Sequence, residues 1–98
     1  MIVYFFRWRV RTDREDDFRS SWAEVTRVLR AKGSGGSALF RAADGTWCGI
    51  ARWPDAMSRE RAMAEVDLTS QRNIMQASSE LIEVLHLNEE LNLWAAYP

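Results

Sequence analysis

The sequence is poor in the residues that define disulfide-rich and metal-binding proteins. Its 98 residues include one cysteine, Cys48, and one histidine, His86. A lone cysteine forms no internal disulfide, and one cysteine with one histidine falls short of the ligand set of a structural zinc site. We therefore expect no metal and a reducing compartment, with the cytoplasm as the location.

Neither sign of charge is in excess, and no long apolar run is present. Thirteen basic and fourteen acidic residues give a net charge of −1, so no overall field attracts the chain to nucleic acid or to an anionic membrane. No segment approaches the ~20 apolar residues of a membrane span, and residues 1–6 lack the basic region of a secretory signal. We expect neither nucleic acid nor membrane as a partner.

Aromatic residues, in contrast, are plentiful. Five tryptophans, four phenylalanines and two tyrosines occur in a chain long enough for only one core, which predicts a single domain over residues 1–98. A core of this size is marginally stable, so an interface that removes more apolar surface from water would stabilise it. Aromatics fill cores and interfaces more often than they line ligand pockets.

Residues 2–10 alternate with the period of a strand. One side carries Ile2, Tyr4, Phe6, Trp8 and Val10, and the other begins with Val3 and Phe5. A strand covered only by helices of its own chain would have one wet face, so apolar residues on both sides indicate a second cover. The simplest cover is a second copy of the chain, in a homodimer.

Helical spacing predicts the next element and two later ones. Residues 12–15, Thr-Asp-Arg-Glu, have the pattern of a capping box, and an apolar stripe of Phe18, Trp22, Val25 and Leu29 follows. We expect this helix to stop at Lys32-Gly33. A second helix should begin near Asp55 and break at residues 67–70. A third should then end near Leu85, although residues 81–87 also fit a strand.

Three further strands are expected, at residues 38–42, 46–53 and 89–97. Asp44-Gly45 joins the first two and predicts a type I′ hairpin turn, which needs positive φ at both residues. Pro54 cannot donate to a ladder, so the middle strand should stop at Trp53. The expected order of elements is β-α-β-β-α-α-β.

This order, with the segment from Ser37 to Trp47 running on to Trp53-Pro54, resembles the antibiotic-biosynthesis monooxygenase-like family over nearly the whole chain. The resemblance implies an α+β, ferredoxin-like fold: an antiparallel four-stranded sheet with helices on one face. Two such sheets then face each other in a dimeric α/β barrel. Members include cofactor-free oxygenases of polyketide tailoring, haem-degrading enzymes and proteins with no assigned activity.

The resemblance separates these activities only in part. Haem-degrading members use an Asn on the first strand and a His after the third, whereas residues 2–10 contain no Asn and His86 lies far along the chain. Polyketide-oxidising members have a Trp near the end of the third strand, matched here by Trp53. Those members also have a nearby Asn and Tyr, whereas residues 46–53 contain no Asn and residues 54–96 contain no Tyr.

A cofactor-free oxidation needs little from the protein beyond a dry pocket, donors for a developing anion and a base. The substrate itself, an anthrone or a quinol-like phenol, donates the electron to oxygen once it is deprotonated. Tyr4, Trp22 and Trp53 are the expected substrate-binding walls, and Trp53, Arg52 and His86 the expected catalytic residues. The alternative, favoured by amphipathic spacing, is that the three aromatics are core.

His86 and Cys48 also have simpler interpretations. An imidazole titrates near neutrality, but at the end of the third helix His86 would equally suit the negative end of the helix dipole, and we favour that role. Cys48, in mid-strand between apolar neighbours, is expected to behave as a small, inert hydrophobe with no catalytic role.

Four arginines lie near the polar ends of the expected strands: Arg7, Arg9, Arg41 and Arg52. They could form an anion site for a carboxylate or a phenolate. Ion pairing with Glu89, Glu90 or a second chain is the interpretation we favour. The charged runs at residues 11–19 and 59–65 are expected to be solvated helix faces.

Two functional hypotheses follow. The first is a homodimeric, cofactor-independent monooxygenase that acts on a small aromatic or polyketide-like molecule. The second is a non-catalytic protein of the same fold that binds a small hydrophobic compound or only dimerises. An open cavity at Tyr4, Trp22 and Trp53 would favour the first hypothesis, and a filled interior the second.

Overall fold

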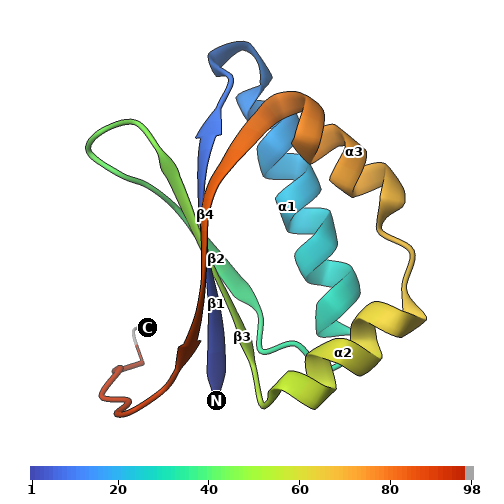
Figure 1. The fold of residues 1–98 in the computed structure, drawn as a ribbon, viewed down its shortest axis with the longest axis vertical. Coiled ribbons are helices and arrows are strands. Elements are labelled where there is room, and N and C mark those ends of the chain that lie inside the picture. Colours follow the sequence, from blue (N-terminus) through green and yellow to red (C-terminus); the bar gives the residue numbers. More distant parts are fainter. Residues whose placement is uncertain (97–98) are drawn as a thin grey trace.

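The computed structural model describes residues 1–96 as a four-stranded antiparallel sheet with three α-helices on one face (Figure 1). The elements are β1 (Ile2–Val10), the 3-10 turn η1 (Thr12–Arg14), α1 (Glu15–Arg30), β2 (Ser37–Arg41), β3 (Trp47–Trp53), α2 (Ala56–Glu65), α3 (Thr69–Ser78) and β4 (Ser79–Asn88). The strand order is β2-β3-β1-β4. This is the α+β, ferredoxin-like fold that the sequence predicted.

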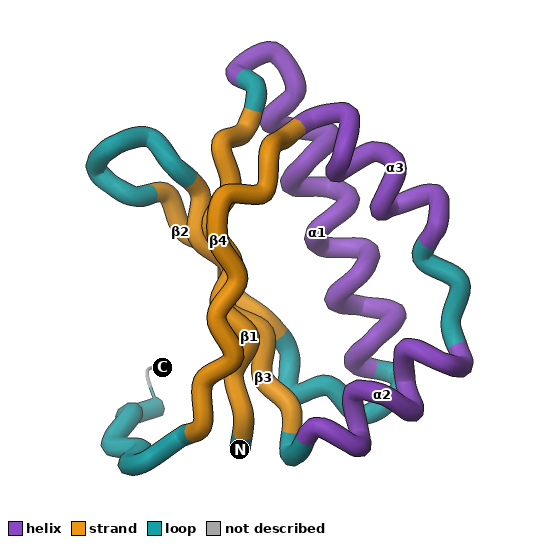
Figure 2. The backbone as a smooth tube through the Cα atoms, in the orientation of Figure 1, coloured by secondary structure: helices purple, strands orange, loops and turns teal. Residues whose placement is uncertain are grey.

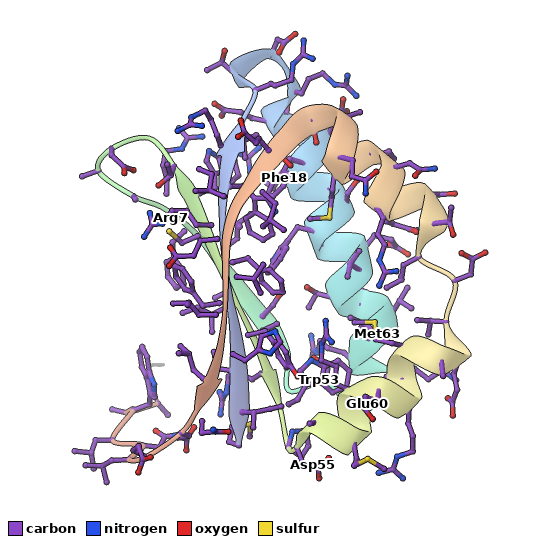
Figure 3. The ribbon with its side chains drawn as sticks, in the orientation of Figure 1. Arg7, Phe18, Trp53, Asp55, Glu60 and Met63 are labelled. Carbon is purple, nitrogen blue, oxygen red and sulfur yellow. The ribbon has the colours of Figure 1, made fainter. Side chains whose placement is uncertain are left out.

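The two faces of the sheet differ in what covers them. Residues paired across antiparallel strands share a face, so Tyr4, Phe6 and Trp8 lie on the helix side with Ala51, Gly49 and Trp47. Arg7 projects to the opposite side, away from all three helices, whereas Phe18 of α1 lies against the sheet (Figure 3). We call these the inner and outer faces. The tube in Figure 2 shows all the helices on the inner side.

Two groups of buried side chains join α1 to the inner face. One contains Trp8, Val10, Phe18 and Trp47, and the other contains Tyr4, Leu29, Trp53, Ala62 and Leu68. Phe6 packs against both. The apolar stripe predicted on α1 is confirmed, because its two outermost members, Phe18 and Leu29, are buried and the two between them, Trp22 and Val25, pack against these groups.

The two ends of α1 differ in how well the sequence signals work. The expected capping box is wrong: residues 12–14 form η1, and neither that turn nor α1 has a side-chain hydrogen bond at its N-cap. The predicted stop is confirmed. Gly33 has φ of 108°, and the Ser34 N–H donates to the Leu29 carbonyl at 3.0 Å, which is the pattern of a Schellman cap.

The hairpin between β2 and β3 forms where expected but with a different turn. Only glycines have positive φ among residues 1–96, so Asp44 cannot occupy the first central position of a type I′ turn. Instead the Gly45 N–H donates to the Ala42 carbonyl at 3.0 Å, and Gly45 has φ of 88°. The loop thus has three residues, and the Asp44 carboxylate holds it by accepting from the Thr46 hydroxyl at 2.6 Å.

The last strand is the largest departure from expectation. α3 ends at Ser78 rather than near Leu85, and β4 occupies Ser79–Asn88, so the strand alternative for residues 81–87 was correct. Residues 89–96 form no strand, against the prediction for residues 89–97, and Tyr97 lies outside the described residues. A strand needs a neighbour to pair with, and this tail leaves the sheet toward its outer side (Figure 1).

Pro54 follows the last residue of β3, as expected, and the Asp55 side chain caps α2 by accepting from the Ser58 N–H at 2.7 Å. The predicted break between α2 and α3 is also confirmed, since α2 ends at Glu65 and α3 begins at Thr69. No helix within residues 1–96 combines the length and apolarity needed to cross a membrane.

Gly49 sets how closely α1 approaches the sheet. A Cβ atom at this position would lie 2.6 Å from Cη2 of Trp22 and 2.9 Å from Cζ3 of Trp8. The two indoles are in edge-to-face contact, with ring centroids 5.2 Å apart. They occupy the space that any other residue in the middle of β3 would fill.

We therefore expect Gly49→Ala to lower the free energy of unfolding by about 1–3 kcal/mol, the usual cost of overpacking. Urea denaturation measures it. In a Trp22→Leu background the same substitution should cost less, because the nearest clashing atom is gone. An equal cost in both backgrounds would contradict this account of the packing.

Candidate functional site

A cavity of about 400 Å³ lies between the inner face and the helices. This volume is within the range of roughly 300–1,000 Å³ typical of small-molecule sites. The sheet and α1 contribute Tyr4, Phe6, Trp8, Trp22, Leu29, Ala51 and Trp53 to its wall, and the α2–α3 side contributes Arg59, Met63, Leu68, Arg72, Met75 and Gln76. The interior is therefore not closed into a continuous core.

The three predicted substrate-binding aromatics, Tyr4, Trp22 and Trp53, all line this cavity. Tyr4 and Trp53 are 7% and 1% exposed and also belong to a buried core group, so each serves both packing and the cavity wall. Core packing and pocket lining were alternative predictions for these residues, and the structure shows that one side chain can do both. Figure 3 shows Trp53 extending from β3 into the space between sheet and helices, with Met63 of α2 on the other side.

The Trp53 indole N–H is a donor without a protein partner in the described part of the chain. None of the side-chain hydrogen bonds of residues 1–96 uses it, and no fully buried side-chain nitrogen there lacks a partner. Trp53 lines the cavity and is 1% exposed, so the surrounding core holds its indole in one position. A donor held this rigidly suits a developing negative charge on a bound molecule.

Tyr4 lies between a cation and the only histidine. The Arg59 guanidinium carbon is 4.2 Å from the centroid of the Tyr4 ring, which is a cation–π contact. The His86 ring meets the same tyrosine edge-on, with centroids 4.6 Å apart. His86 pairs with Tyr4 in the β1–β4 register, so both lie on the inner face.

His86 is thus not at a helix end, and the expectation that it partners a helix dipole is wrong. The cause is the early end of α3, which leaves His86 in β4, two residues before the end of that strand. His86 contacts Tyr4, which lines the cavity, but is not itself one of the lining residues. The imidazole is exposed at the free edge of the sheet.

Arg52 does not join the other predicted catalytic residues. It pairs with Val3 in the β1–β3 register and therefore lies on the outer face, whereas its neighbour Trp53 lies on the inner face. Successive side chains of a strand point to opposite faces, so the two cannot share the cavity. Cys48, expected to be an inert hydrophobe, is half-buried on the outer face, where it pairs with Arg7 of β1.

The other predicted arginines form surface ion pairs. Arg7 and Arg9 lie 3.6 and 3.5 Å from carboxylates of β4, those of Glu83 and Glu80, and Arg41 lies 2.6 Å from Glu15 of α1. Their partners are not Glu89 and Glu90. The pairs of Arg7 and Arg9 join β1 to β4, and the pair of Arg41 joins β2 to α1. Such exposed pairs contribute only ~0–1 kcal/mol each.

The polar residues of the cavity that sequence reasoning missed include Arg59, Arg72 and Gln76. Arg59 was expected on a solvated helix face, but it is half-buried against Tyr4. Its spacing carried a signal, since Arg59, Met63 and the buried Ala62 lie three and four residues apart and share one face of α2. Arg72 and Gln76 on α3 are likewise four residues apart.

The acidic residues with shifted pKa values hydrogen-bond to nearby backbone N–H groups and do not line the cavity. Hydrogen bonds from the Thr46 side chain and backbone lower the pKa of Asp44. Bonds from Ser58 and Thr69 lower the pKa values of Asp55 and Asp67 in the same way. All three carboxylates hold turns or helix starts. Within residues 1–96, no group of three or more His, Cys, Asp or Glu is placed to hold a metal ion.

The fold is shared with solved structures of antibiotic-biosynthesis monooxygenases. SnoaB, a cofactor-independent oxygenase from Streptomyces nogalater, matches with a TM-score of 0.80 and 21% identity, over 94% of this chain and 95% of that one. An antibiotic biosynthesis monooxygenase matches with a TM-score of 0.72 and 16% identity, over 91% and 98% of the two chains. Rv0793 from Mycobacterium tuberculosis has a TM-score of 0.77 and 15% identity, over 95% and 98%.

At these identities the similarity establishes the shared fold. No family model matches the sequence, and no curated protein matches it either. The expected resemblance to the antibiotic-biosynthesis monooxygenase-like proteins is thus confirmed at the level of structure.

Filling the cavity should reduce ligand binding without harming the fold. Ala51 lines the cavity from the middle of β3, so Ala51→Leu places extra carbon atoms in its open space. We expect the affinity for a neutral aromatic probe, 2-naphthol, to fall by about tenfold or more, as measured by isothermal titration calorimetry. Ala64→Leu, at an exposed position of α2 that does not line the cavity, is the matched control, and an equal effect of both variants would argue against the cavity as the binding site.

Proposed function

We propose that this protein is a cofactor-independent monooxygenase that oxidises a small aromatic or polyketide-like molecule in the cavity beneath its helices. The observation that carries the proposal is the cavity itself, about 400 Å³ in volume and walled by Tyr4, Trp22 and Trp53. A planar aromatic molecule fits an apolar, aromatic wall of this kind. The fold shared with SnoaB, a cofactor-independent oxygenase, supports the same conclusion.

Oxidation of an anthrone by O₂ illustrates the proposed reaction, with all atoms and electrons accounted for. Loss of a proton from its CH₂ group gives an anion, which transfers one electron to O₂ and forms a carbon radical and superoxide. These combine into a hydroperoxide once a proton returns. Loss of water then breaks the O–O bond and leaves a carbonyl, so that CH₂ and O₂ become C=O and H₂O. The protein must lower the cost of the anion and keep bulk water away.

The residues suited to this task lie on the inner face. Trp53 offers its indole N–H to the oxygen that carries the negative charge, and Arg59, held against Tyr4, adds a positive charge. His86, beside Tyr4, is the residue we propose as acceptor of the substrate proton and as its donor to the peroxide. Arg52 has no part in this scheme, because it is on the outer face.

The outer face supports the second part of the proposal, a homodimer built face to face. Apolar side chains from all four strands gather there: Val3, Phe5, Phe40, Ile50, Leu85 and Leu87. Phe40, Leu85 and Leu87 are 52%, 42% and 45% exposed in the single chain. None of the helices within residues 1–96 covers this face, and so large an apolar surface is unfavourable in water. A second sheet of the same kind would remove it from water.

Oxygen uptake with 1,8-dihydroxyanthrone tests the activity. We expect one O₂ consumed per anthraquinone formed, well above the rate of uncatalysed oxidation. Trp53→Phe should lower kcat by about 100-fold, the usual effect of removing one donor to a developing anion.

Trp47→Phe is the matched control, because Trp47 is equally buried but does not line the cavity. Its kcat should stay within about twofold of the unmodified protein. If the anthrone binds but no oxygen is consumed above background, the non-catalytic binding protein becomes the better account.

Placing a charge at the centre of the outer face tests the dimer. Ile50 pairs with both Phe5 and Ala38 across its neighbouring strands. We expect sedimentation to show a dimer for the unmodified protein and a monomer for Ile50→Glu, because a buried unpaired carboxylate is strongly unfavourable. Met57→Glu, an exposed position on α2, should leave the mass unchanged, and a monomeric unmodified protein would contradict the proposal.

A further inference from the structure

The geometry points to a substrate that carries a permanent anionic group, a carboxylate on an aromatic framework, bound by Arg59 and Arg72. This inference rests on the proposed function for its site and extends it to a class of substrate. It depends on the charge of the cavity wall and on the contacts of these two arginines.

The charge of the cavity wall is entirely positive. Arg59 of α2 and Arg72 of α3 are its two charged side chains, and none of the residues that line it is Asp or Glu. The rest of the wall is apolar, aromatic or neutral and polar. The whole protein has a net charge of −1, with nearly equal numbers of acidic and basic residues. The cavity wall, with two arginines and no acidic residue, therefore differs in charge from the rest of the protein.

Both guanidinium groups contact soft, neutral partners. Arg59 lies over the Tyr4 ring at 4.2 Å, and a nitrogen of Arg72 donates to the Met63 sulfur at 3.6 Å. A thioether is a weak acceptor, and a ring face takes none of the five N–H donors in the plane of a guanidinium.

Neither Arg59 nor Arg72 has a carboxylate within ion-pair distance in the described part of the chain. Arg41, for comparison, lies 2.6 Å from Glu15, whereas Arg30, Arg52 and Arg61 on the surface also lack a carboxylate partner among residues 1–96. Apart from the weak bond from Arg72 to the Met63 sulfur, no side-chain hydrogen bond or ion pair among residues 1–96 uses the N–H donors of these two arginines, so they are available to a ligand.

A carboxylate is the group that best satisfies this arrangement. It accepts bidentate hydrogen bonds from guanidinium groups, and these charge-assisted bonds are about twice as strong as neutral ones. The aromatic walls at Trp22 and Trp53 would hold the rings, while the carboxylate is directed toward α2 and α3. A neutral molecule of the same shape would leave both cations without a partner.

Binding of two probes that differ only in charge tests the inference. Anthraquinone-2-carboxylate and anthraquinone-2-carboxamide are titrated into the full-length protein at neutral pH by calorimetry. We expect the carboxylate to bind about tenfold or more tightly than the carboxamide. Arg59→Gln and Arg72→Gln should each reduce this preference, and the double variant should abolish it, with the carboxamide affinity unchanged.

Arg61→Gln is the matched control, because Arg61 is an exposed arginine of α2 that does not line the cavity. It should keep the full preference, and thermal unfolding of each variant shows whether the fold is intact. Equal affinity of the two probes for the unmodified protein would overturn the inference and leave the proposed oxidation standing. A preference that survives the double variant, or binding of neither probe, would overturn it as well. Oxygen uptake with the uncharged anthrone decides the proposed function independently.

Discussion

The contact of α1 with the middle of the sheet is the constraint on which the rest of the structure depends. Gly49 has no side chain, so Trp22 from the helix and Trp8 from β1 pack directly over the strand. Phe18 continues this packing, with its ring 5.0 Å from that of Trp8 and 5.6 Å from that of Trp47. Aromatic rings are large and rigid, so these contacts set the distance between α1 and the sheet. At this distance, the space between the sheet and the α2–α3 side is not filled, and it forms the cavity.

The two sides of the cavity wall supply different kinds of side chain. The sheet and α1 supply bulky walls such as Trp53, which the core holds in one orientation, and α2 and α3 supply the longer, softer side chains of Arg59, Met63 and Arg72. A rigid wall fixes the plane of an aromatic ligand, and longer side chains adapt to its substituents. The helix that begins at Asp55 thus contributes to recognition as well as to the core, through Arg59 and the buried Ala62.

Sequence reasoning succeeded where a pattern is local and failed where it needed a neighbour. The stripe on α1, the stop at Gly33 and the end of β3 follow from spacing, a positive φ and a missing N–H. Residues 89–96 alternate as well as β1 does, yet they form no strand, because alternation selects faces and does not provide a partner. The same limit applies to the site: Tyr4, Trp22 and Trp53 were found by size and spacing, whereas Arg59 was taken for a surface residue.

By itself, then, the sequence determined the type and order of elements, the two-sided apolar character of the sheet and the aromatic side chains that could meet beneath α1. Only the tertiary structure decided that these aromatics border an open cavity, that Arg52 and Trp53 lie on opposite faces, and that His86 belongs to a strand beside Tyr4. The physical reason is that periodicity reports which way a side chain points relative to its own element. What it meets there depends on strand register and helix placement, which arise from contacts between residues far apart in the chain.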